Sequence, residues 1–462
     1  MALEKPSAIY AANILIEDRI DADAYNYLYI KEISKLKFSG LKLANITDFY
    51  SVEMLTGFEN SKYINYTNQG IPFIRCKNIR DNYFDEDDLT YISEEVYNIL
   101  KRAQLSDDDL LYTKTGSNLG QVCCVPKGMK AIASSNCCFF KKSQNKSIDS
   151  HYVSTFLNSK YGKVQTNRAQ TKTGQPTIDF QRLKQFLIPI PSPEIQKYIG
   201  DKVRKAEELR EEAKRLKKEA EEILNKELNL KDVEFYIKQT NNKKYSWTES
   251  IEIEDRIDSE FYKPKYRYLS KLNNMSELSY YYKISKKRIN KNIDRKIKYI
   301  DLSSVNNIIE PSDFNTKELP SRAQFLVKEG NLIISTLKGS NKISIIPEHL
   351  NDSVCSTGFI VIASKSHLTT EYLYLVFSNK VFNMQIERYS TGSIMSGVNH
   401  DNFNKMLIPV ISNKQIIDTI TNKIRKHFRL LYYSKQLIQE AKQDVEDLIE
   451  GNFDMSKVKA NN

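Results

Sequence analysis

One six-residue stretch occurs twice, unchanged, in this chain, and it constrains the fold more than any other feature. Residues 16–21 read Ile-Glu-Asp-Arg-Ile-Asp, and residues 253–258 repeat them. Shorter matches follow in the same order in both halves: Gly116-Ser117-Asn118 with Gly339-Ser340-Asn341, and Leu187-Ile188-Pro189 with Leu407-Ile408-Pro409. Chance identity would not continue in order along the chain, so the sequence predicts a tandem duplication of one module.

Length and charge indicate what such a duplicated chain can hold. With 462 residues, each half is long enough to bury a core of its own, with connecting elements left over. The net charge is +11, which favours a polyanionic partner, nucleic acid first and an anionic membrane surface second. Lys and Arg outnumber Asp and Glu by only 69 to 58, so the basicity that matters must be local.

Neither a membrane span nor a metal centre is expected. No run approaches the roughly 18 to 20 apolar residues that cross a bilayer, and acidic residues interrupt the first 20 positions where a signal peptide would be apolar. We therefore expect a soluble, cytoplasmic protein. The six cysteines include the neighbours Cys123-Cys124 and Cys137-Cys138. Neighbouring side chains on a strand face opposite ways, and no Cys-x-x-Cys or His spacing accompanies them, so buried reduced thiols are favoured over a zinc site.

Short apolar runs between turn residues predict strands in each half. They are 71–74, 110–113, 121–125 and 137–140 in the first half, and 297–300, 332–335, 343–346 and 359–363 in the second. Helical periodicity follows at 151–163 and 370–386. The predicted fold class is α+β, with two similar mixed α/β domains in tandem.

A long helix is predicted after each Leu-Ile-Pro. The first has apolar residues at heptad spacing, and the second fits the same register with His427 and Ser434 as polar interruptions. Two such helices in one chain are expected to pack together as an antiparallel coiled coil. Its predicted seam residues, which would also form a partner-binding surface, are Leu209, Leu216, Ile223, Ile424, Leu431, Ile438 and Val445.

Three charged features favour structural over functional interpretations. His427 at a seam is expected to be partly exposed or to set register. The alternating charges of 201–222 indicate a solvated helix face rather than a nucleic-acid tail. Arg19 and Arg256 of the repeated hexapeptide are expected to pair with Asp18, Asp21 or their counterparts and so to fix the start of each domain, because acidic neighbours repel phosphate.

The absence of known catalytic motifs argues against an enzyme. The sequence has no glycine-rich phosphate loop, no His-Glu-x-x-His, no Gly-x-Ser-x-Gly, and no Asn-Pro-Pro-Tyr/Phe or Asp-Pro-Pro-Tyr tetrapeptide for a flipped base. The nearest Glu-x-Lys to a nuclease pattern, Glu212-Ala213-Lys214, lies in the predicted long helix. We therefore expect a chain that is not an enzyme and holds no cofactor or catalytic residue.

Polar loops in both halves carry side chains that suit DNA. Glycine lets backbone approach a phosphate, Ser and Thr reach phosphate oxygens, and Asn, Gln, Lys and Arg can read base edges. A Gly-Ser-Asn turn is by default only a hairpin connection, yet it recurs beside Lys in both halves. The candidate DNA-binding residues of the first half are Lys114, Ser117, Asn118, Gln121, Arg168, Thr171, Lys172, Thr173 and Gln175. Those of the second half are Lys338, Ser340, Asn341, Lys342, Arg388, Ser390, Thr391 and Ser393.

Taken together, the two domains, each closed by Leu-Ile-Pro and a long helix, resemble the specificity subunit of type I restriction-modification systems. The most telling residues are 256–264, Arg-Ile-Asp-Ser-Glu-Phe-Tyr-Lys-Pro, which look like the family's domain opening, and 187–196, Leu-Ile-Pro-Ile-Pro-Ser-Pro-Glu-Ile-Gln, which look like its strand-to-helix junction. The second junction, 407–415, lacks the later prolines.

The resemblance implies a division of the chain and a set of partners. Residues 1–193 and 231–412 would be target-recognition domains, 194–230 and 413–450 spacer helices, and 451–462 a C-terminal tail. Each domain would read half of a bipartite double-stranded DNA target. Two methyltransferase (modification) subunits carrying S-adenosylmethionine would bind around the helices, and a motor-nuclease (restriction) subunit would join them. Two alternatives stay open: a coiled-coil scaffold without DNA contact, and a divergent DNA-modifying enzyme.

Overall fold

The computed structural model describes residues 22–55, 64–144, 147–171, 174–240, 247, 253, 256–392 and 396–459. It divides into two compact units. Unit 1 comprises residues 1–208 and 433–462, and unit 2 comprises residues 209–432. No helix within the described ranges is both long and apolar enough to cross a membrane. The first copy of the repeated hexapeptide, with Arg19, lies outside these ranges.

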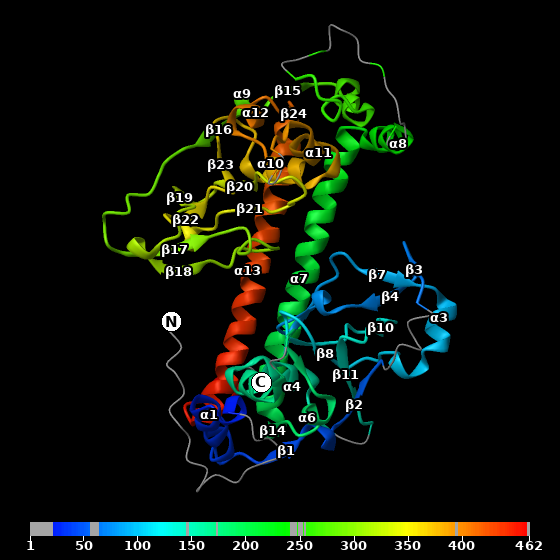
Figure 1. The fold of residues 1–462 in the computed structure, drawn as a ribbon, viewed down its shortest axis with the longest axis vertical. Helices are drawn as coiled ribbons and strands as arrows, with labels where there is room; N and C mark the ends of the chain where they lie inside the picture. Colours follow the sequence, from blue (N-terminus) through cyan, green and yellow to red (C-terminus); the bar gives the residue numbers. More distant parts are fainter. Residues whose placement is uncertain are drawn as a thin grey trace. The chain divides into compact units, whose positions relative to one another are not determined.

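The central sheet of unit 1 is antiparallel, in the order β2 (Tyr50–Met54), β11 (Cys137–Lys142), β8 (Leu110–Thr113) and β9 (Val122–Cys124) (Figure 1). It separates two apolar cores, because side chains alternate along each strand. Cys124 and Cys138 enter the core beneath the helices, whereas Cys123 and Cys137 enter the core on the other face. The prediction that neighbouring cysteines face opposite ways is therefore confirmed.

A second sheet closes the other core of unit 1. Its order is β10 (Ile132–Ala133), β4 (Ile71–Ile74), β7 (Thr90–Ile92) and β3 (Tyr66–Thr67), with β10 parallel to β4. Smaller pairs join β1 (Leu43–Asn45) to β14 (Leu187–Pro189), β5 (Ile79–Arg80) to β6 (Tyr83–Phe84), and β12 (Gln170–Thr171) to β13 (Thr177–Ile178). The remaining α-helices of the unit's N-terminal segment are α1 (Tyr27–Lys37), α3 (Glu94–Ile99), α4 (Ser150–Asn158), α5 (Lys160–Ala169) and α6 (Phe180–Leu183).

The single helix expected over 151–163 is two helices in the structure. Ser159 is extended, at φ −70° and ψ 171°, and it ends α4 and begins α5. Its hydroxyl donates to the Phe156 carbonyl over 2.6 Å. A Cβ at Gly162 would lie 2.3 Å from the Leu157 carbonyl oxygen, so the two helices meet at a contact that only glycine allows. Hydrophobic spacing continues across this break and hides it in the sequence.

Unit 2 repeats the plan. Its central sheet has the order β16 (Tyr282–Ser285), β23 (Phe359–Ser364), β20 (Leu332–Ser335) and β21 (Ile343–Ile345). The second sheet has the order β18 (Ser312–Asn315), β17 (Lys296–Ile300), β22 (Val354–Ser356) and β19 (Ala323–Leu326), again with one parallel pair, β17 and β22. β15 (Met275–Glu277) pairs with β24 (Leu407–Pro409).

The helices of unit 2 show the same break. The segment expected over 370–386 is α10 (Thr370–Ser378) and α11 (Lys380–Tyr389), divided at the extended residue Asn379. The other short α-helices are α8 (Leu230–Thr240), α9 (Leu278–Tyr281) and α12 (His400–Asn404). Within the described ranges, the 3-10 helices are η2 (Ala22–Tyr25), η3 (Ile46–Asp48), η4 (Cys76–Asn78), η5 (Lys101–Ala103), η7 (Pro264–Lys271), η8 (Thr316–Glu318) and η9 (Glu348–Leu350).

The duplication extends to individual hydrogen bonds. The Tyr152 hydroxyl donates to the Pro189 carbonyl over 2.9 Å in unit 1, and Tyr372 donates to Pro409 over 2.9 Å in unit 2. In each unit a buried glutamine side chain hydrogen-bonds both backbone groups of the leucine that begins the Leu-Ile-Pro strand. Gln165 pairs with both the N–H and the carbonyl of Leu187, as Gln385 does with Leu407. The two units therefore share these core hydrogen bonds as well as the strand order of their central sheets.

Two long helices, α7 (Pro193–Glu227) and α13 (Lys414–Glu450), contribute to both units. In unit 1, Lys202 of α7 pairs with Asp444 of α13. In unit 2, Glu219 pairs with Lys423 over 2.5 Å, and Glu212 pairs with Lys426 over 2.6 Å. In each unit the higher numbers of α7 meet the lower numbers of α13, so the two helix segments run antiparallel.

The predicted seam residues are mostly buried. The buried ones are Leu209, Leu216, Ile424, Leu431, Ile438 and Val445. Ile223 is only partly buried and its neighbour Leu224 takes the core position. The first helix ends at Glu227 rather than 230, because Asn229 adopts a left-handed conformation, φ 51°, before α8 begins. A C-terminal turn of helix, α14 (Ser456–Lys459), follows α13.

Candidate nucleic-acid interface

Each unit presents a polar hairpin loop at the end of its central sheet. In unit 1 the loop of residues 114–121, here called hairpin loop 1, joins β8 to β9. In unit 2 the loop of residues 336–342, hairpin loop 2, joins β20 to β21. The default interpretation of Gly-Ser-Asn as a hairpin connection is confirmed in both units.

In each unit, residues that follow the second predicted loop lie against the hairpin loop. In unit 1, the Gly116 N–H donates to the Pro176 carbonyl over 3.0 Å, and the hydroxyls of Thr115 and Thr177 lie 2.9 Å apart. In unit 2, the Lys338 N–H donates to the Ser396 carbonyl over 2.9 Å. The Val398 N–H donates to the Thr336 carbonyl, also over 2.9 Å. Segments that are distant in sequence thus form one polar surface in each unit.

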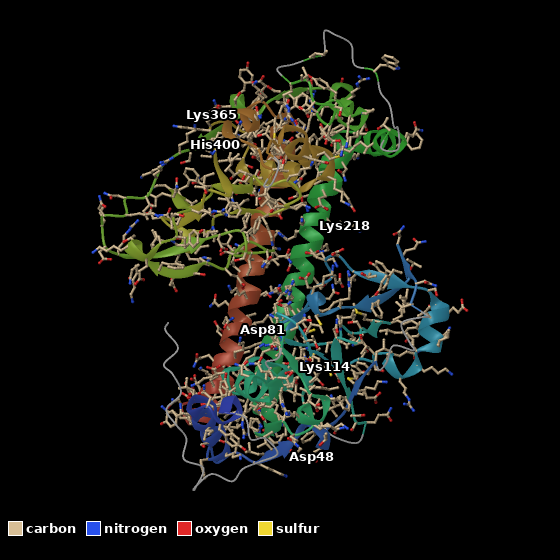
Figure 2. The ribbon with its side chains drawn as sticks, in the orientation of Figure 1. Asp48, Asp81, Lys114, Lys218, Lys365 and His400 are labelled. Carbon is tan, nitrogen blue, oxygen red and sulfur yellow. The ribbon has the colours of Figure 1, made fainter. Side chains whose placement is uncertain are left out.

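Several candidate side chains lie on these surfaces. Ser117, Gln175, Lys338, Asn341 and Thr391 are exposed, and Lys114, Asn118, Gln121, Thr171, Ser340 and Lys342 are partly exposed. Some already have partners. The Lys114 ammonium lies 3.5 Å from the Met54 sulfur, and Lys342 donates to the Asn306 side chain over 2.6 Å. Figure 2 labels Lys114 within unit 1.

Other candidates do not face solvent, or lie outside the described ranges. Ser390 is buried and its hydroxyl donates to the Ile386 carbonyl over 2.6 Å, as a helix-terminal side chain commonly does. Lys172, Thr173 and Ser393 fall outside the described residues. The DNA-binding assignment of every candidate stays a prediction.

The two candidate arginines occupy equivalent structural positions. Arg168 donates from Nε to the Ala24 carbonyl over 3.0 Å and lies over the Tyr25 ring. Arg388 donates from Nε to the Phe261 carbonyl over 3.2 Å, with its guanidinium 4.2 Å from the centre of that ring. Ala24 and Phe261 stand at the same distance from the two hexapeptides. These contacts favour a structural role for both arginines, which tie α5 and α11 to the opening of each unit.

Arg256 of the second hexapeptide pairs with an acidic neighbour, as the structural interpretation predicts. Its Nε donates to Asp258, the counterpart of Asp21, over 2.7 Å. That ion pair lowers the pKa of Asp258, because the cation favours the ionised carboxylate. The Tyr262 hydroxyl donates to the Arg256 carbonyl over 2.5 Å. The expectation that this arginine pins the start of its domain is confirmed for the second copy.

Unit 2 contains a basic segment that is not among the candidate DNA-binding residues predicted from the sequence. Residues 286–295 include Lys286, Lys287, Arg288, Lys291 and Arg295 against a single Asp294. The signal that could have found it is the density of Lys and Arg, which is visible in the sequence. The corresponding stretch of unit 1, residues 55–70, has one Lys and one Glu.

This basic segment lies beside β19, which precedes hairpin loop 2 in the chain. The Ile289 N–H donates to the Gln324 carbonyl and the Leu326 N–H to the Lys287 carbonyl, each over 2.9 Å, so residues 287–289 run along β19. Phe325 of β19 contacts the His400 ring of α12, with ring centres 6.0 Å apart. Burial lowers the pKa of His400, and the nearby charge of Lys286 adds to that effect.

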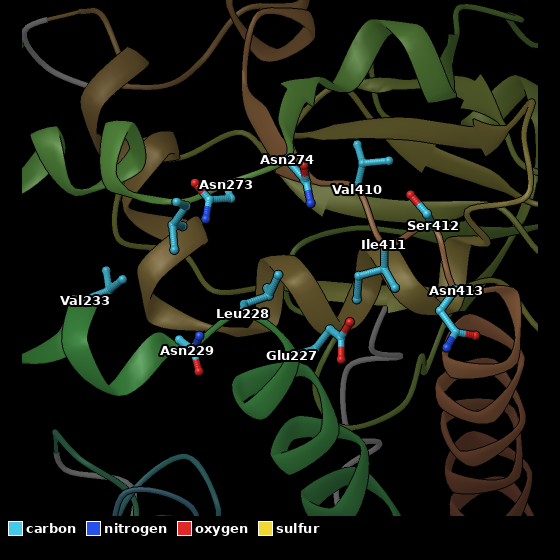
Figure 3. Close-up of a pocket in the computed structure, with 11 residues that line it drawn as sticks. Glu227, Leu228, Asn229, Val233, Asn273, Asn274, Val410, Ile411, Ser412 and Asn413 are labelled. Carbon is cyan, nitrogen blue, oxygen red and sulfur yellow. The ribbon is translucent and has the colours of Figure 1, made fainter.

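Unit 2 also has a pocket of about 690 Å³ at the C-terminal end of α7 (Figure 3). Its polar lining includes Glu227, Asn229, Asn274 and Asn413. None of the candidate DNA-binding residues lines it. Within the described ranges, no three His, Cys, Asp or Glu side chains gather closely enough to hold a metal ion.

The geometry defines a class of protein in which one mixed α/β unit occurs twice, each time with a polar two-loop surface and a long helix. Residues 39–222 match the family model described as the type I restriction modification DNA specificity domain. Residues 39–222 are therefore similar to a specificity domain of type I restriction-modification systems, and over these residues the resemblance seen in the sequence is confirmed. The match does not extend over residues 223–462.

Solved structures of that family are similar over most of the chain. A type I restriction-modification S subunit from M. genitalium is 12% identical, with a TM-score of 0.42, covering 90% of this chain and 97% of the other. The HsdS subunit from Thermoanaerobacter tengcongensis is 11% identical, with a TM-score of 0.30, covering 90% and 97%. None of the curated proteins matches the chain.

Proposed function

We propose that this chain is the DNA-specificity subunit of a type I restriction-modification complex, and that each unit reads one half of a bipartite double-stranded DNA target. The observation that carries the proposal is the match of residues 39–222 to a specificity domain, together with a second unit whose central sheet has the same strand order and whose core has the same hydrogen bonds. Two equivalent units in one chain suit a target with two separate half-sites.

Recognition is assigned to the two polar surfaces. Side chains such as Ser117, Gln175, Lys338 and Asn341 are exposed there and can reach phosphates or base edges. The basic segment at 286–295 supplies positive charge beside the second surface. Since that charge has no counterpart in unit 1, phosphate contacts are expected to be denser on the second half-site.

The long helices are proposed as a coiled-coil spacer and as the docking surface for partners. At 1.5 Å per residue, helices of 35 and 37 residues are about 52 and 55 Å long, or about one and a half turns of B-DNA. Two modification subunits would bring S-adenosylmethionine and the methyl-transfer chemistry, and a restriction subunit would complete the complex. This chain would contribute no catalytic group of its own.

Long-read sequencing of methylated bases tests the proposal in a host that carries the chain with its partner subunits. We expect methylation at a bipartite sequence that disappears when the gene for this chain is deleted and returns on complementation. Unchanged methylation after deletion would refute the proposal. Metal- or cofactor-dependent activity of the purified chain alone would instead indicate a DNA-modifying enzyme, and failure to bind any duplex with partners present would indicate a scaffold.

A further inference from the structure

Two cysteine thiols touch at the base of hairpin loop 1. Cys76 begins η4 and Cys137 begins β11, and their sulfur atoms lie 3.6 Å apart. All six cysteines of the chain are free thiols. A disulfide bond is about 2.05 Å long, so a movement of about 1.5 Å would join these two sulfurs.

The two thiols differ in access. Cys76 is partly exposed, and its sulfur lies 3.2 Å from the Asn136 carbonyl oxygen. Cys137 is buried, with the Ser134 hydroxyl 3.4 Å from its sulfur. A reagent from solution therefore meets Cys76 first, and Cys137 stands behind it as a second thiol.

The surroundings of Cys76 also favour its reactive form. A hydrogen bond from the Cys137 thiol lowers the pKa of Cys76, and the Thr115 N–H and the charge of Lys114 lower it further. The thiolate is the nucleophilic form of cysteine. A partly exposed thiol with a lowered pKa beside a second thiol is the arrangement found in redox-sensitive cysteines.

We propose that Cys76 and Cys137 form a reversible disulfide when the chain meets a peroxide. The Cys76 thiolate attacks a peroxide oxygen, the O–O bond breaks, and the departing hydroxide takes up a proton to become water. Cys76 is then a sulfenic acid. Cys137 attacks its sulfur, the S–O bond breaks, and hydroxide leaves with the Cys137 proton as a second water. The two thiols lose two electrons, and hydrogen peroxide is reduced to two waters.

The other cysteines lack this geometry. Cys123, Cys124, Cys138 and Cys355 are buried. Cys138 is adjacent to Cys137 but faces the other core, beneath the helices. It therefore serves as a matched control that shares the strand but not the contact.

Oxidation would act on the start of hairpin loop 1. As a disulfide, Cys76 has no S–H to donate to the Asn136 carbonyl, which also accepts the Lys114 N–H over 3.1 Å. In its ionised form Cys76 instead accepts from the Thr115 N–H, and the disulfide removes that negative charge. Any effect on DNA binding rests on the proposed function, whereas the disulfide itself does not.

The test treats the full-length chain with hydrogen peroxide, blocks remaining thiols with iodoacetamide, and maps the peptides by mass spectrometry. We expect one cross-linked species, lighter by two hydrogens, that joins Cys76 to Cys137 and is reversed by dithiothreitol. Cys138→Ser should behave like the wild type. Cys76→Ser should give no cross-link, and Cys137→Ser should leave a Cys76 sulfenic acid that dimedone traps.

Hydrogen exchange at residues 114–116, compared between the oxidised and reduced chains, gives a readout that does not need DNA. We expect a change there and none in hairpin loop 2. The proposal is overturned if Cys76 and Cys137 both remain open to alkylation after peroxide treatment, or if the cross-linked peptides of the wild type join other cysteines. Since Cys76 is partly exposed, Cys76→Ser decides the matter even if Cys137→Ser fails to fold.

Discussion

Gln165 and Gln385 are single side chains that hold the same joint in the two units. Each amide satisfies both the N–H and the carbonyl of the residue that begins the Leu-Ile-Pro strand, at distances of 2.8 to 3.0 Å. Removing the amide would leave both backbone groups without their partner, in a largely buried place. An unsatisfied buried group costs about 1–3 kcal/mol.

We expect Gln165→Ala and Gln385→Ala each to lower the free energy of unfolding by about 1–3 kcal/mol. Urea denaturation of the full chain provides the measurement. Gln181→Ala is the matched control, because that side chain is exposed, and it should change stability little. If only one of the two variants is destabilised, the glutamine does not have the same role in both units.

His427 makes a different prediction at the residue scale. It is 6% exposed, and its Nδ1–H donates to the Ala213 carbonyl over 2.8 Å. Burial lowers the pKa of His427 from 6.5 to about 4. The unfolded chain therefore takes up a proton that the folded chain does not, and stability present above pH 6.5 is lost as the pH falls towards 4.

The expected slope from this one histidine is about 1.4 kcal/mol per pH unit between pH 6 and pH 4.5. Unfolding free energies of the wild type and of His427→Gln, compared across that range, isolate its contribution. The variant should lose this part of the pH dependence. Parallel pH profiles for the two proteins would contradict the account.

Some residues could not be assigned from sequence because their partners lie far along the chain. Arg168 and Arg388 stand beside polar loops in the sequence, which is why the sequence predicts that they bind DNA. In the structure each donates to a carbonyl more than 120 residues away. The interaction depends on tertiary packing, which local residue pattern does not encode.

At the scale of elements, strands were the most predictable feature. The runs at 71–74, 110–113 and 332–335 are strands with those bounds. Two of them are buried at every position, so they appear in the sequence as short continuous apolar runs between turn residues. The helix breaks at Ser159 and Asn379 could not be predicted, since apolar spacing continues across them. Pairing of the two polar loops in each unit was also beyond the sequence, because it arises from backbone hydrogen bonds between distant segments.

The basic segment of unit 2 gives a prediction about salt. Replacing Lys286, Lys287 and Arg288 by Gln should weaken DNA binding and reduce the slope of log K against log salt by about 0.9 for each phosphate that is no longer neutralised. The preferred sequence should stay the same, since phosphate contacts carry no sequence information directly. Binding titrations at several salt concentrations provide the measurement.

Neutralising Lys31, Lys35 and Lys37 of α1 is the control for this experiment, because it removes the same charge from a helix of unit 1. Its salt slope should stay close to that of the wild type. Equal effects of the two triple variants would mean that overall charge, and not the segment at 286–295, governs binding.

At the scale of the whole molecule, the duplication explains why one chain would have two readers. The repeated hexapeptide predicted the duplication. The matching core hydrogen bonds of the two units show that the duplication includes their packed interiors. The reading itself could not be derived from sequence, because backbone conformation decides which side chain meets which base edge.

The helices make a prediction at this scale. Inserting one or two helical turns after Ala213, with a matching insertion beside His427 in α13, should lengthen the gap between half-sites and leave both half-sites unchanged. Methylome sequencing measures this. An altered half-site with an unchanged gap would show that the helices are not the spacer.

The most direct test of the two-reader claim changes one reader alone. In a host with the complete system, Lys338, Asn341 and Lys342 are replaced together by Ala, and in a second strain Ser117, Asn118 and Gln121 are replaced instead. Long-read methylome sequencing should then show relaxation of one half-site in the first strain and of the other in the second, with the gap unchanged. Relaxation of both half-sites by either variant, or of neither, would contradict the account.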